Sequence, residues 1–207
     1  MIFNLFKSKP SLKELIPNGF VDIHSHILPG IDDGAKNIEE STLMISEMKK
    51  LGFSKIITTP HTYPGLYDNT NDTILKSYNS ITNNNSNKNY VKYSSEYMMN
   101  SDLINKTIEQ SILCISDKYM LIEMSFLNMP INCYEIIFEL QLNGYKLILA
   151  HPERYLYLNN NFNNFYKLKK AGCLFQLNLL SVVGYYGKEV LSLSDKLLTQ
   201  NLIDFVG

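Results

Sequence analysis

The segment Phe20-Val-Asp-Ile-His-Ser-His26 opens the patterned part of the chain and decides how the rest is interpreted. Its β-branched and aromatic residues predict a strand over 20–26. Side chains two positions apart on a strand point to the same face, so His24 and His26 are expected to present both imidazoles together. A His-x-His pair of this kind is typical of a metal site, and imidazole with carboxylate suits Zn, Mn or Fe.

Outward from this segment, strand-like and helix-like stretches alternate along the chain. The predicted strands are short, are rich in Val, Ile, Leu, Tyr or Phe, and cover residues 20–26, 55–60, 90–97, 119–125, 145–151, 173–177 and 203–207. Such alternation favours an α/β fold with a parallel sheet or barrel. Seven strands predict a barrel-like α/β fold, in which catalytic groups sit at the carboxyl ends of the strands.

Two of the intervening helices have clear boundary signals. Ile38–Leu51 has Asn37 as its expected N-cap, Glu40 in a capping-box-like position, and Gly52 as its C-terminal stop. The second helix is expected over 130–142, with a proline in its first turn and Asn-Gly after its end.

Length and composition set outer limits on what the chain can be. At 207 residues it fits one domain, which we place at 19–207 after an N-terminal tail at 1–18. The net charge of −1 gives no basis for nucleic-acid binding. No apolar run approaches the roughly 20 residues that cross a bilayer, and the first residues lack the order of a secretory signal. We therefore expect a cytoplasmic protein without a transmembrane segment.

The three cysteines exclude one kind of phosphate chemistry. They are scattered, form no Cys-x-x-Cys pair and indicate no disulfide framework. Cysteine-dependent phosphatases place a Cys six residues before an Arg that cradles the phosphate. The only arginine of this chain is Arg154, and residue 148 is isoleucine, so that route is closed.

Six potential metal ligands lie at or near predicted strand ends. They comprise all four histidines of the chain and two glutamates: His24, His26, His61, Glu96, Glu123 and His151. A single histidine is more often an ordinary core or surface residue. Chance would have to place every histidine near a strand end, and it would also have to bury an acid inside Leu-Ile-Glu-Met, where an unpaired charge is costly. The pattern therefore favours a metal site.

Other polar residues follow these ligands. Asp32 and Gly34 are interpreted as an Asp-Gly turn, whereas Asp33 could reach the site. Arg154 lies three residues beyond His151, and arginine matches phosphate oxygens bidentately. A single arginine beside eighteen lysines indicates a position where lysine will not do.

The motifs together resemble a known family. Val21-Asp-Ile-His-Ser-His26, Asp32-Asp-Gly34, Thr58-Thr-Pro-His-Thr-Tyr-Pro64, Leu121-Ile-Glu-Met-Ser125 and Leu149-Ala-His-Pro-Glu-Arg154 occur in that order. They resemble the PHP (polymerase and histidinol phosphatase) superfamily, and within it the manganese-dependent protein-tyrosine phosphatases of bacterial capsule and exopolysaccharide gene clusters. The resemblance runs from about Phe20 to the last residue and implies a distorted seven-stranded α/β barrel.

The resemblance also implies a set of site residues and a chemistry. It makes His24, His26, Glu96, Glu123 and His151 ligands of two or three divalent ions, most commonly Mn, with Fe or Zn as alternatives. Catalytic residues beside the metals are Asp33, His61 and Arg154, and His61 either binds a third metal or contacts phosphate. Tyr63 and Tyr67 follow His61 in a loop that either offers aromatic surface to a phenol ring or packs as a lid or core loop.

The implied substrate is phosphotyrosine on a bacterial tyrosine autokinase that regulates polysaccharide export, which would bring the protein close to the membrane. One departure from the family is expected to matter. The family's final Gly-Ser/Thr-Asp-x-His motif would follow Gly207, so we expect a barrel lacking its C-terminal end. Two alternatives stay open: a small-molecule phosphoesterase such as histidinol phosphatase, or a non-catalytic barrel that binds phosphotyrosine or the kinase if the chain naturally ends there.

Overall fold

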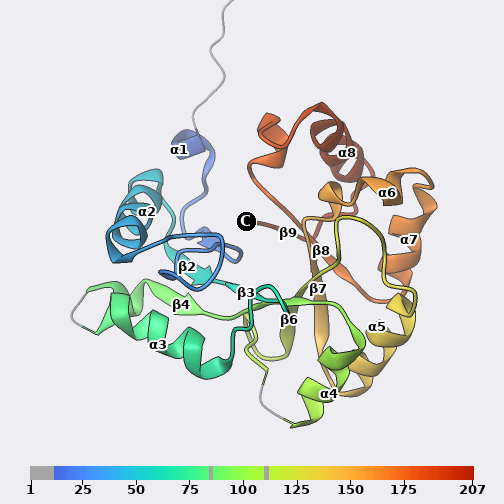
Figure 1. Ribbon diagram of the computed structural model, residues 1–207. Coiled ribbons are helices and arrows are strands. Elements are labelled where there is room, and N and C mark those ends of the chain that lie inside the picture. Colours follow the sequence, from blue (N-terminus) through green and yellow to red (C-terminus); the bar gives the residue numbers. More distant parts are fainter. Residues whose placement is uncertain (1–11, 84–85, 110–111) are drawn as a thin grey trace, which may run out of the picture.

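Nine short strands, all paired in parallel, form two sheets in the computed structural model, which describes residues 12–83, 86–109 and 112–207. The strands are β1 Val21–Asp22, β2 Lys55–Thr58, β3 His61–Thr62, β4 Val91–Tyr93, β5 Glu96–Met98, β6 Tyr119–Glu123, β7 Lys146–Ala150, β8 Leu174–Leu177 and β9 Phe205–Val206. One sheet has the order β1-β2-β4, and the other has the order β3-β5-β6-β7-β8-β9 (Figure 1). The expected parallel α/β fold is confirmed.

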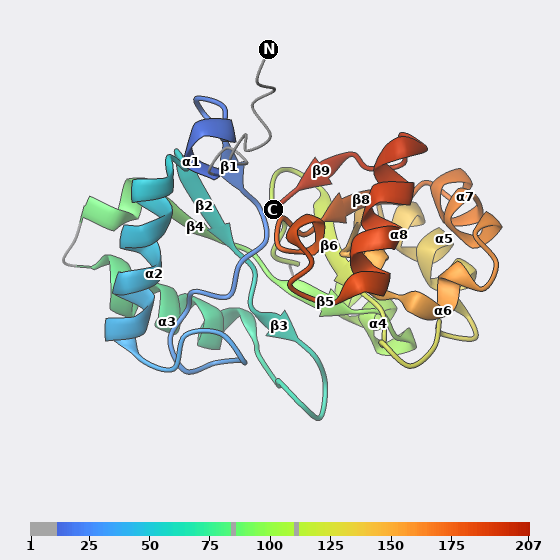
Figure 2. The same ribbon diagram turned by 90° about the horizontal axis from the view of Figure 1, so that it is seen from above.

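Helices cover the outer faces of both sheets (Figures 1 and 2). Their α-helical bounds are α1 Leu12–Leu15, α2 Ile38–Leu51, α3 Asn71–Thr82, α4 Ser101–Glu109, α5 Cys133–Leu142, α6 Leu156–Asn159, α7 Asn163–Lys170 and α8 Lys188–Thr199. Three short 3₁₀ turns are η1 Ser86–Asn89, η2 Pro152–Arg154 and η3 Ser181–Val183. Within the described residues, no helix has the length and apolar character needed to span a membrane.

The predicted helix Ile38–Leu51 is confirmed at both ends. Asn37 accepts a hydrogen bond from the Glu40 backbone N–H at 2.9 Å, and Gly52 ends the helix with φ 106°. The Glu40 carboxylate, however, accepts from the Lys36 N–H, so the capping box is not completed. The helix expected over 130–142 begins at Cys133, because the chain first forms a turn after the proline.

The strand predicted over 90–97 is wrong as a single element. It divides into β4 and β5, which belong to different sheets and are separated by the buried pair Ser94 and Ser95. The neighbouring chain breaks at the same level, between β2 and β3, where Pro60 has no N–H to give to the ladder. Hydrogen bonds from Ser94 N–H to Thr58 and from Glu96 N–H to Pro60 carry the pairing across both breaks.

The first predicted strand is also shorter than expected, since β1 ends at Asp22. The residues after it continue alongside β2, where the Thr59 N–H donates to the Ser25 carbonyl at 2.8 Å. In place of the expected seven-stranded barrel, the described residues form a curved arrangement of nine strands in two ladders, which backbone hydrogen bonds do not close. At its far end Gly207 approaches the His24 backbone, because a Cβ added there would lie 3.3 Å from the His24 nitrogen.

The α1 helix lies inside the expected tail at 1–18, and residues 1–11 of that tail lie outside the described residues. The main core forms between α4, α5, α7 and α8 and the outer face of β6, β7 and β8. Met120 and Ile122 of β6 belong to it, whereas Leu121 packs with Ile148 and Ala150 on the opposite, inner face. Since side chains alternate along a strand, Glu123 shares the inner face with Leu121.

Candidate metal centre

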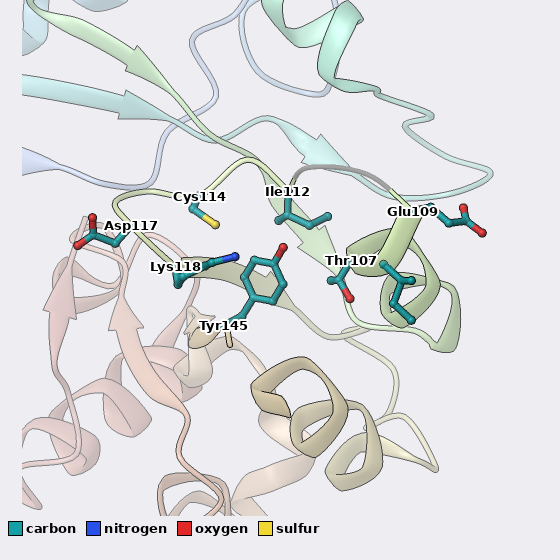
Figure 3. A pocket seen from close by; sticks show the side chains of 8 residues that line it. Thr107, Glu109, Ile112, Cys114, Asp117, Lys118 and Tyr145 are labelled. Atoms are coloured by element: carbon teal, nitrogen blue, oxygen red, sulfur yellow. The ribbon is translucent and has the colours of Figure 1, made fainter. Parts of the chain in front are cut away.

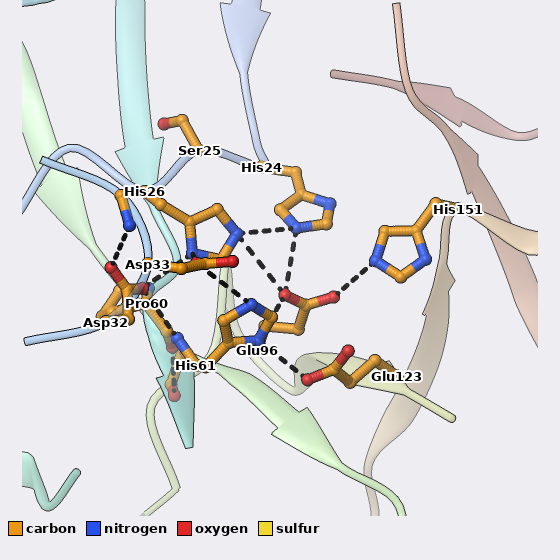
Figure 4. A network of polar contacts seen from close by, with 12 residues as sticks. His24, Ser25, His26, Asp32, Asp33, Pro60, His61, Glu96, Glu123 and His151 are labelled. Carbon is orange, nitrogen blue, oxygen red and sulfur yellow. Dashed lines mark hydrogen bonds and ion pairs between the residues drawn. The ribbon is translucent and has the colours of Figure 1, made fainter. Parts of the chain in front are cut away.

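The predicted ligands converge on the inner face of the curved sheets (Figure 4), but His61 and Glu96 are the first residues of β3 and β5 rather than residues at carboxyl ends, as was expected. Glu96 opens β5, Glu123 ends β6 and His151 follows β7 directly. His24 and His26 lie beyond β1 in extended chain rather than within the strand, and yet both rings point to the same centre. The convergence of all six predicted ligands is thus a tertiary feature produced by five different strand ends.

The Glu96 carboxylate lies at the middle of the cluster. Its Oε2 atom is 3.2 Å from Nε2 of His24, 3.5 Å from Nε2 of His26 and 3.1 Å from Nδ1 of His61. Its Oε1 atom is 3.0 Å from Nε2 of His151. Both oxygens are buried without a partner in hydrogen-bond geometry. Because an unsatisfied buried carboxylate is costly, nitrogen and oxygen donors gathered in this way fit a bound cation.

Three overlapping sets of donors could each hold one ion. They are His24 with His26 and Glu96, His26 with Asp33 and His61, and His61 with Glu96 and Glu123. Within each set, one donor atom from every residue lies within 4.8 Å of the others. The mixture of imidazole and carboxylate suits Mn, Fe or Zn rather than Ca or a thiolate-bound metal.

Two acceptors that sequence reasoning did not assign orient the histidines. The side chain of Asp32 is buried, and its Oδ2 atom accepts from Nδ1 of His26 at 2.7 Å, while the His61 backbone N–H donates to the same oxygen. Gln176 places Oε1 at 2.7 Å from Nδ1 of His24. Such partners fix the tautomer and ring orientation of a metal-binding imidazole.

The interpretation of Asp32 as a mere turn residue is therefore incomplete. Its second oxygen does accept from the Gly34 N–H, as an Asp turn requires, and the first oxygen serves the two histidines. Asp33 is the more exposed of the pair, and its Oδ1 atom lies 3.5 Å from Nε2 of His61. The acidic residue at this turn was a visible signal, but the sequence could not show which oxygen faced the histidines.

Asp32→Asn is expected to weaken metal affinity by about 10- to 100-fold, because the amide cannot hold the His26 ring as a carboxylate does. Folding should be retained, since the side-chain volume is unchanged. Calorimetric titration with the metal measures this affinity. An affinity equal to that of the unaltered protein would show that Asp32 acts only in the turn.

Gly34 is required for close packing rather than for a positive φ. A Cβ at this position would lie 1.9 Å from the His26 carbonyl oxygen and 2.5 Å from the His26 Cβ. The backbone is held there by the hydrogen bond from the Ala35 N–H to that carbonyl at 3.1 Å. The Asp32–Gly34 turn and the His26 backbone are therefore in direct contact.

Gly34→Ala is consequently expected to displace the turn from His26 and to destabilise the protein by about 2–3 kcal/mol, in the upper part of the range for single substitutions. Chemical denaturation of the metal-free protein measures the change in the free energy of unfolding. Gly65→Ala, at an exposed hairpin position with open space around it, provides a comparison in which any loss comes only from its φ of 81°. An equal or smaller loss at Gly34 would contradict the packing argument.

Burial and neighbouring charge shift the pKa values of the cluster residues in different directions. Burial lowers the pKa of His24, but the charge of Glu96 outweighs it and raises the pKa to about 9. Burial also lowers the pKa of His61, and the hydrogen-bonded Glu123 carboxylate with Glu96 raises it to about 9. For His151 burial prevails and the pKa falls to about 4. Burial and the charge of Glu96 raise the pKa of Glu123.

Arg154 lies at the end of η2, in a turn that begins at His151 with a left-handed φ of 35°. Such backbone is uncommon outside glycine and is frequently found at functional sites. The guanidinium carbon lies 4.4 Å from the ring centre of Phe126 and 4.5 Å from that of Tyr186. Neither aromatic residue was predicted, because a single Phe or Tyr in a strand-end segment carries no distinguishing pattern.

The tyrosines predicted in the loop after His61 have different surroundings. The ring of Tyr67 stacks on the His61 imidazole with a centroid separation of 5.4 Å and an angle of 11°. Tyr63 joins Tyr67 through the backbone, with its N–H donating to the Tyr67 carbonyl at 2.9 Å. Tyr67 therefore borders the cluster directly, whereas the backbone hydrogen bond of Tyr63 stabilises the hairpin.

A separate hollow lies near the amino ends of β6 and β7 (Figure 3). Its lining includes Cys114, Lys118 and Tyr145, and the Lys118 ammonium lies 4.6 Å from the Tyr145 ring centre. The predicted metal and catalytic residues are absent from this lining. The hollow is therefore distinct from the histidine cluster.

Comparison with known proteins identifies the family. The family model for capsular polysaccharide synthesis, CpsB/CapC, matches residues 20–207. The chain belongs to the CpsB/CapC family. This membership agrees with the PHP resemblance of its motifs, and the matched range includes every predicted ligand.

Curated members of the CpsB/CapC family are similar over most of the chain. Tyrosine-protein phosphatase YwqE of Bacillus subtilis (strain 168) is 31% identical over 195 residues, covering 90% of this chain and 75% of the relative. Putative tyrosine-protein phosphatase CapC of Staphylococcus aureus is 30% identical over 190 residues, covering 90% and 74%.

A solved structure of the same family shares the fold. It is described as one of YwqE from Bacillus subtilis and CpsB from Streptococcus pneumoniae, unique metal-dependent tyrosine phosphatases. The TM-score is 0.83 at 30% identity, over 91% of this chain and 78% of that one. The two-sheet arrangement described above is therefore that of the CpsB/CapC family.

Proposed function

We propose that this chain hydrolyses phosphotyrosine on a protein substrate, in a reaction that requires two or three divalent metal ions. The observation that carries the proposal is the set of three overlapping donor triplets around Glu96, with an arginine in the turn that follows His151. The names of the CpsB/CapC relatives supply the substrate class. The mixed imidazole and carboxylate donors support Mn as the native metal, with Fe and Zn as alternatives.

The ligands in this proposal are the six predicted ones, with Asp33 as a further oxygen donor. His24, His26 and Glu96 would hold one ion, and His61 with Glu96 and Glu123 a second. The triplet of His26, Asp33 and His61 would hold a third. His151, whose Nε2 faces Glu96 and whose pKa is lowered to about 4, is kept neutral and thus ready to donate a lone pair.

When bound, the ions would lower the pKa of a water toward about 7 and neutralise charge on phosphoryl oxygens. The side chains of this chain then perform the remaining tasks. Arg154 offers its fork of N–H donors to the phosphoryl oxygens that the ions leave free. Asp33, mostly exposed beside His61, is placed to orient the leaving oxygen. Since a phenol has a pKa near ~10, its departure needs little acid assistance.

An open mouth supports a protein substrate over an enclosed metabolite. The side chain of Asp33 is 62% exposed, and Phe126 beside Arg154 is 48% exposed. The Tyr67 ring on His61 gives the rim an aromatic surface for the phenol. The partner we propose is a bacterial tyrosine autokinase, which would place the protein in the cytoplasm close to the membrane.

The deciding experiment follows release of phosphate from a phosphotyrosine peptide in Mn²⁺, with and without EDTA. It compares this chain with the chain extended by any coding sequence that follows Gly207. Chelator-sensitive turnover by either form supports the proposal. If both forms bind metal without turnover, the result would instead favour the two alternatives, a small-molecule phosphoesterase and a binding barrel. Assays of histidinol phosphate hydrolysis and of kinase capture then distinguish these two.

Arg154→Lys is expected to leave metal content unchanged and to lower kcat/KM for the peptide by about 10- to 100-fold. Lysine keeps the charge but loses the bidentate fork and the planar contact with the aromatic rings. Metal analysis and steady-state kinetics check both parts. Loss of metal in this variant would show that Arg154 supports the structure of the metal site and does not act only on the phosphate.

A further inference from the structure

The side chain of Arg154 is held by two aromatic rings. Its guanidinium carbon lies over the rings of Phe126 and Tyr186, at 4.4 and 4.5 Å from their centres. Cations within about 6 Å of a ring centre are attracted by its negative face. Among the ion pairs and hydrogen bonds of the described residues, none uses the Arg154 side chain as a donor.

The rings therefore hold the Arg154 guanidinium in place without using its N–H donors. The five N–H groups of a guanidinium lie in its plane, and a ring face attracts the charge without using a strong acceptor oxygen. The arrangement leaves the hydrogen-bonding edge available for an anion.

The two rings come from different segments that are tied to the same turn. Phe126 follows β6 and contacts the rings of His151 and Tyr155, at centroid separations of 5.6 and 5.7 Å. Tyr186 follows η3, in the connection between β8 and α8. Phe126 therefore touches the histidine cluster directly, whereas Tyr186 reaches Arg154 from the β8–α8 connection.

Glu153 links the second segment to the turn that carries Arg154. Although adjacent to the arginine in sequence, its buried carboxylate accepts from the Asn178 backbone N–H at 3.0 Å and from Ser181 Oγ at 2.6 Å. Ser181 is fully buried, so the start of η3 is fixed against the turn. Glu153 thus anchors the segment that brings Tyr186 over Arg154, and its carboxylate forms no ion pair with the arginine within the described part of the chain.

We infer that Phe126 and Tyr186 are positioning residues that hold Arg154 over their ring faces, so that its donor edge binds the phosphoryl oxygens of the substrate. The inference rests on the proposed function for its substrate, but the anion-binding step can be measured separately. The ligand class is a phosphate monoester dianion, for which inorganic phosphate is the minimal probe.

The test compares three variants of the metal-loaded protein. Tyr186→Leu keeps apolar bulk but removes the ring face, Tyr186→Phe keeps the ring, and Val183→Ala is a control in the same segment, 72% exposed and outside the machinery. Phosphate affinity is measured by calorimetry, and the peptide kinetics and metal content are measured in parallel.

We expect Tyr186→Leu to weaken phosphate binding about tenfold and to raise KM for the peptide similarly, with metal content retained. Tyr186→Phe and Val183→Ala should stay within about twofold of the unaltered protein. The conservative variant distinguishes positioning from a merely structural role, because a fold defect would not be rescued by a ring. If Tyr186→Leu does not fold, Phe126→Leu provides the same comparison.

Unchanged phosphate affinity in Tyr186→Leu would overturn the inference, as would equal losses in Tyr186→Leu and Tyr186→Phe. Failure to bind phosphate at all by the metal-loaded protein would overturn it as well. Phosphate binding that depends on the ring, in a protein that does not hydrolyse phosphotyrosine, would uphold the inference and reject the proposed function.

Discussion

Glu96→Gln should abolish nearly all metal-dependent turnover, with a loss of at least about 10³-fold in kcat. The reason is the position of this carboxylate, whose oxygens face four histidines at 3.0–3.5 Å and complete two of the three donor triplets. Metal ions contribute several kcal/mol of charge stabilisation to such reactions, and each 1.36 kcal/mol corresponds to tenfold in rate. Metal analysis and phosphate release measured on the same sample check the result.

The matched control is Glu135→Gln on the exposed side of α5, which makes the same chemical change away from the cluster. It should retain metal and activity. Glu96→Gln should also lose its bound ions at metal concentrations that saturate the control. A folded Glu96→Gln variant that keeps its metal and more than a tenth of its activity would rule out the proposed central role of this residue.

The second large effect is a reversal of pH dependence between the metal-free and metal-loaded protein. In the metal-free fold, the pKa values of His24 and His61 are raised from 6.5 to about 9. A raised folded-state pKa gives stabilisation that is complete below pH 6.5 and is lost as the pH rises through 9. Since one pKa unit corresponds to 1.36 kcal/mol, each histidine contributes on the order of a few kcal/mol, and the contributions overlap because both depend on Glu96.

Below pH 6.5 a different residue dominates. The pKa of His151 is lowered to about 4, so the unfolded chain binds its proton first and stability falls as the pH decreases from 6.5 toward 4. Urea unfolding of the chelator-treated protein is therefore expected to show a maximum near pH 6.5. Stability that rises steadily from pH 6.5 to pH 9 would contradict the assigned interactions of His24 and His61.

Metal binding should change this profile because ions compete with protons for the same nitrogens. At pH 7.5 we expect about two protons to be released per protein molecule when the sites fill, one from His24 and one from His61, which belong to different donor triplets. Calorimetric titration with Mn²⁺ in buffers of different ionisation enthalpy measures that number. The stability of the metal-loaded protein should accordingly rise between pH 6.5 and 9, where that of the metal-free protein falls.

Several parts of this structure were predictable because they depend on neighbours in sequence. The helix Ile38–Leu51 follows from a capping side chain three residues before its paired N–H and from a glycine at its end. The parallel α/β class follows from the alternation of apolar runs with helical stretches. The six candidate ligands could be selected because their residue types recur near the ends of the predicted strands.

Other parts depended on contacts between distant segments. No local pattern shows that 90–97 divides between two sheets, because the break arises where Pro60 of the adjacent chain cannot continue the ladder. Likewise, the pairing of His24 with Gln176 joins residues 152 apart in the chain. The rings over Arg154 come from segments after β6 and β8, and only the packed turn brings them together.

The sequence by itself determined the parallel α/β class and the helix boundaries with strong caps, and it selected the candidate ligands, since these rest on local propensity and residue chemistry. The tertiary structure alone decided the division into two sheets, the central place of Glu96, the choice of Asp32 over Asp33 as the partner of His26, and the aromatic contacts of Arg154. These are set by the register of the strands and by the burial of charge, which are properties of the assembled fold and not of any one segment.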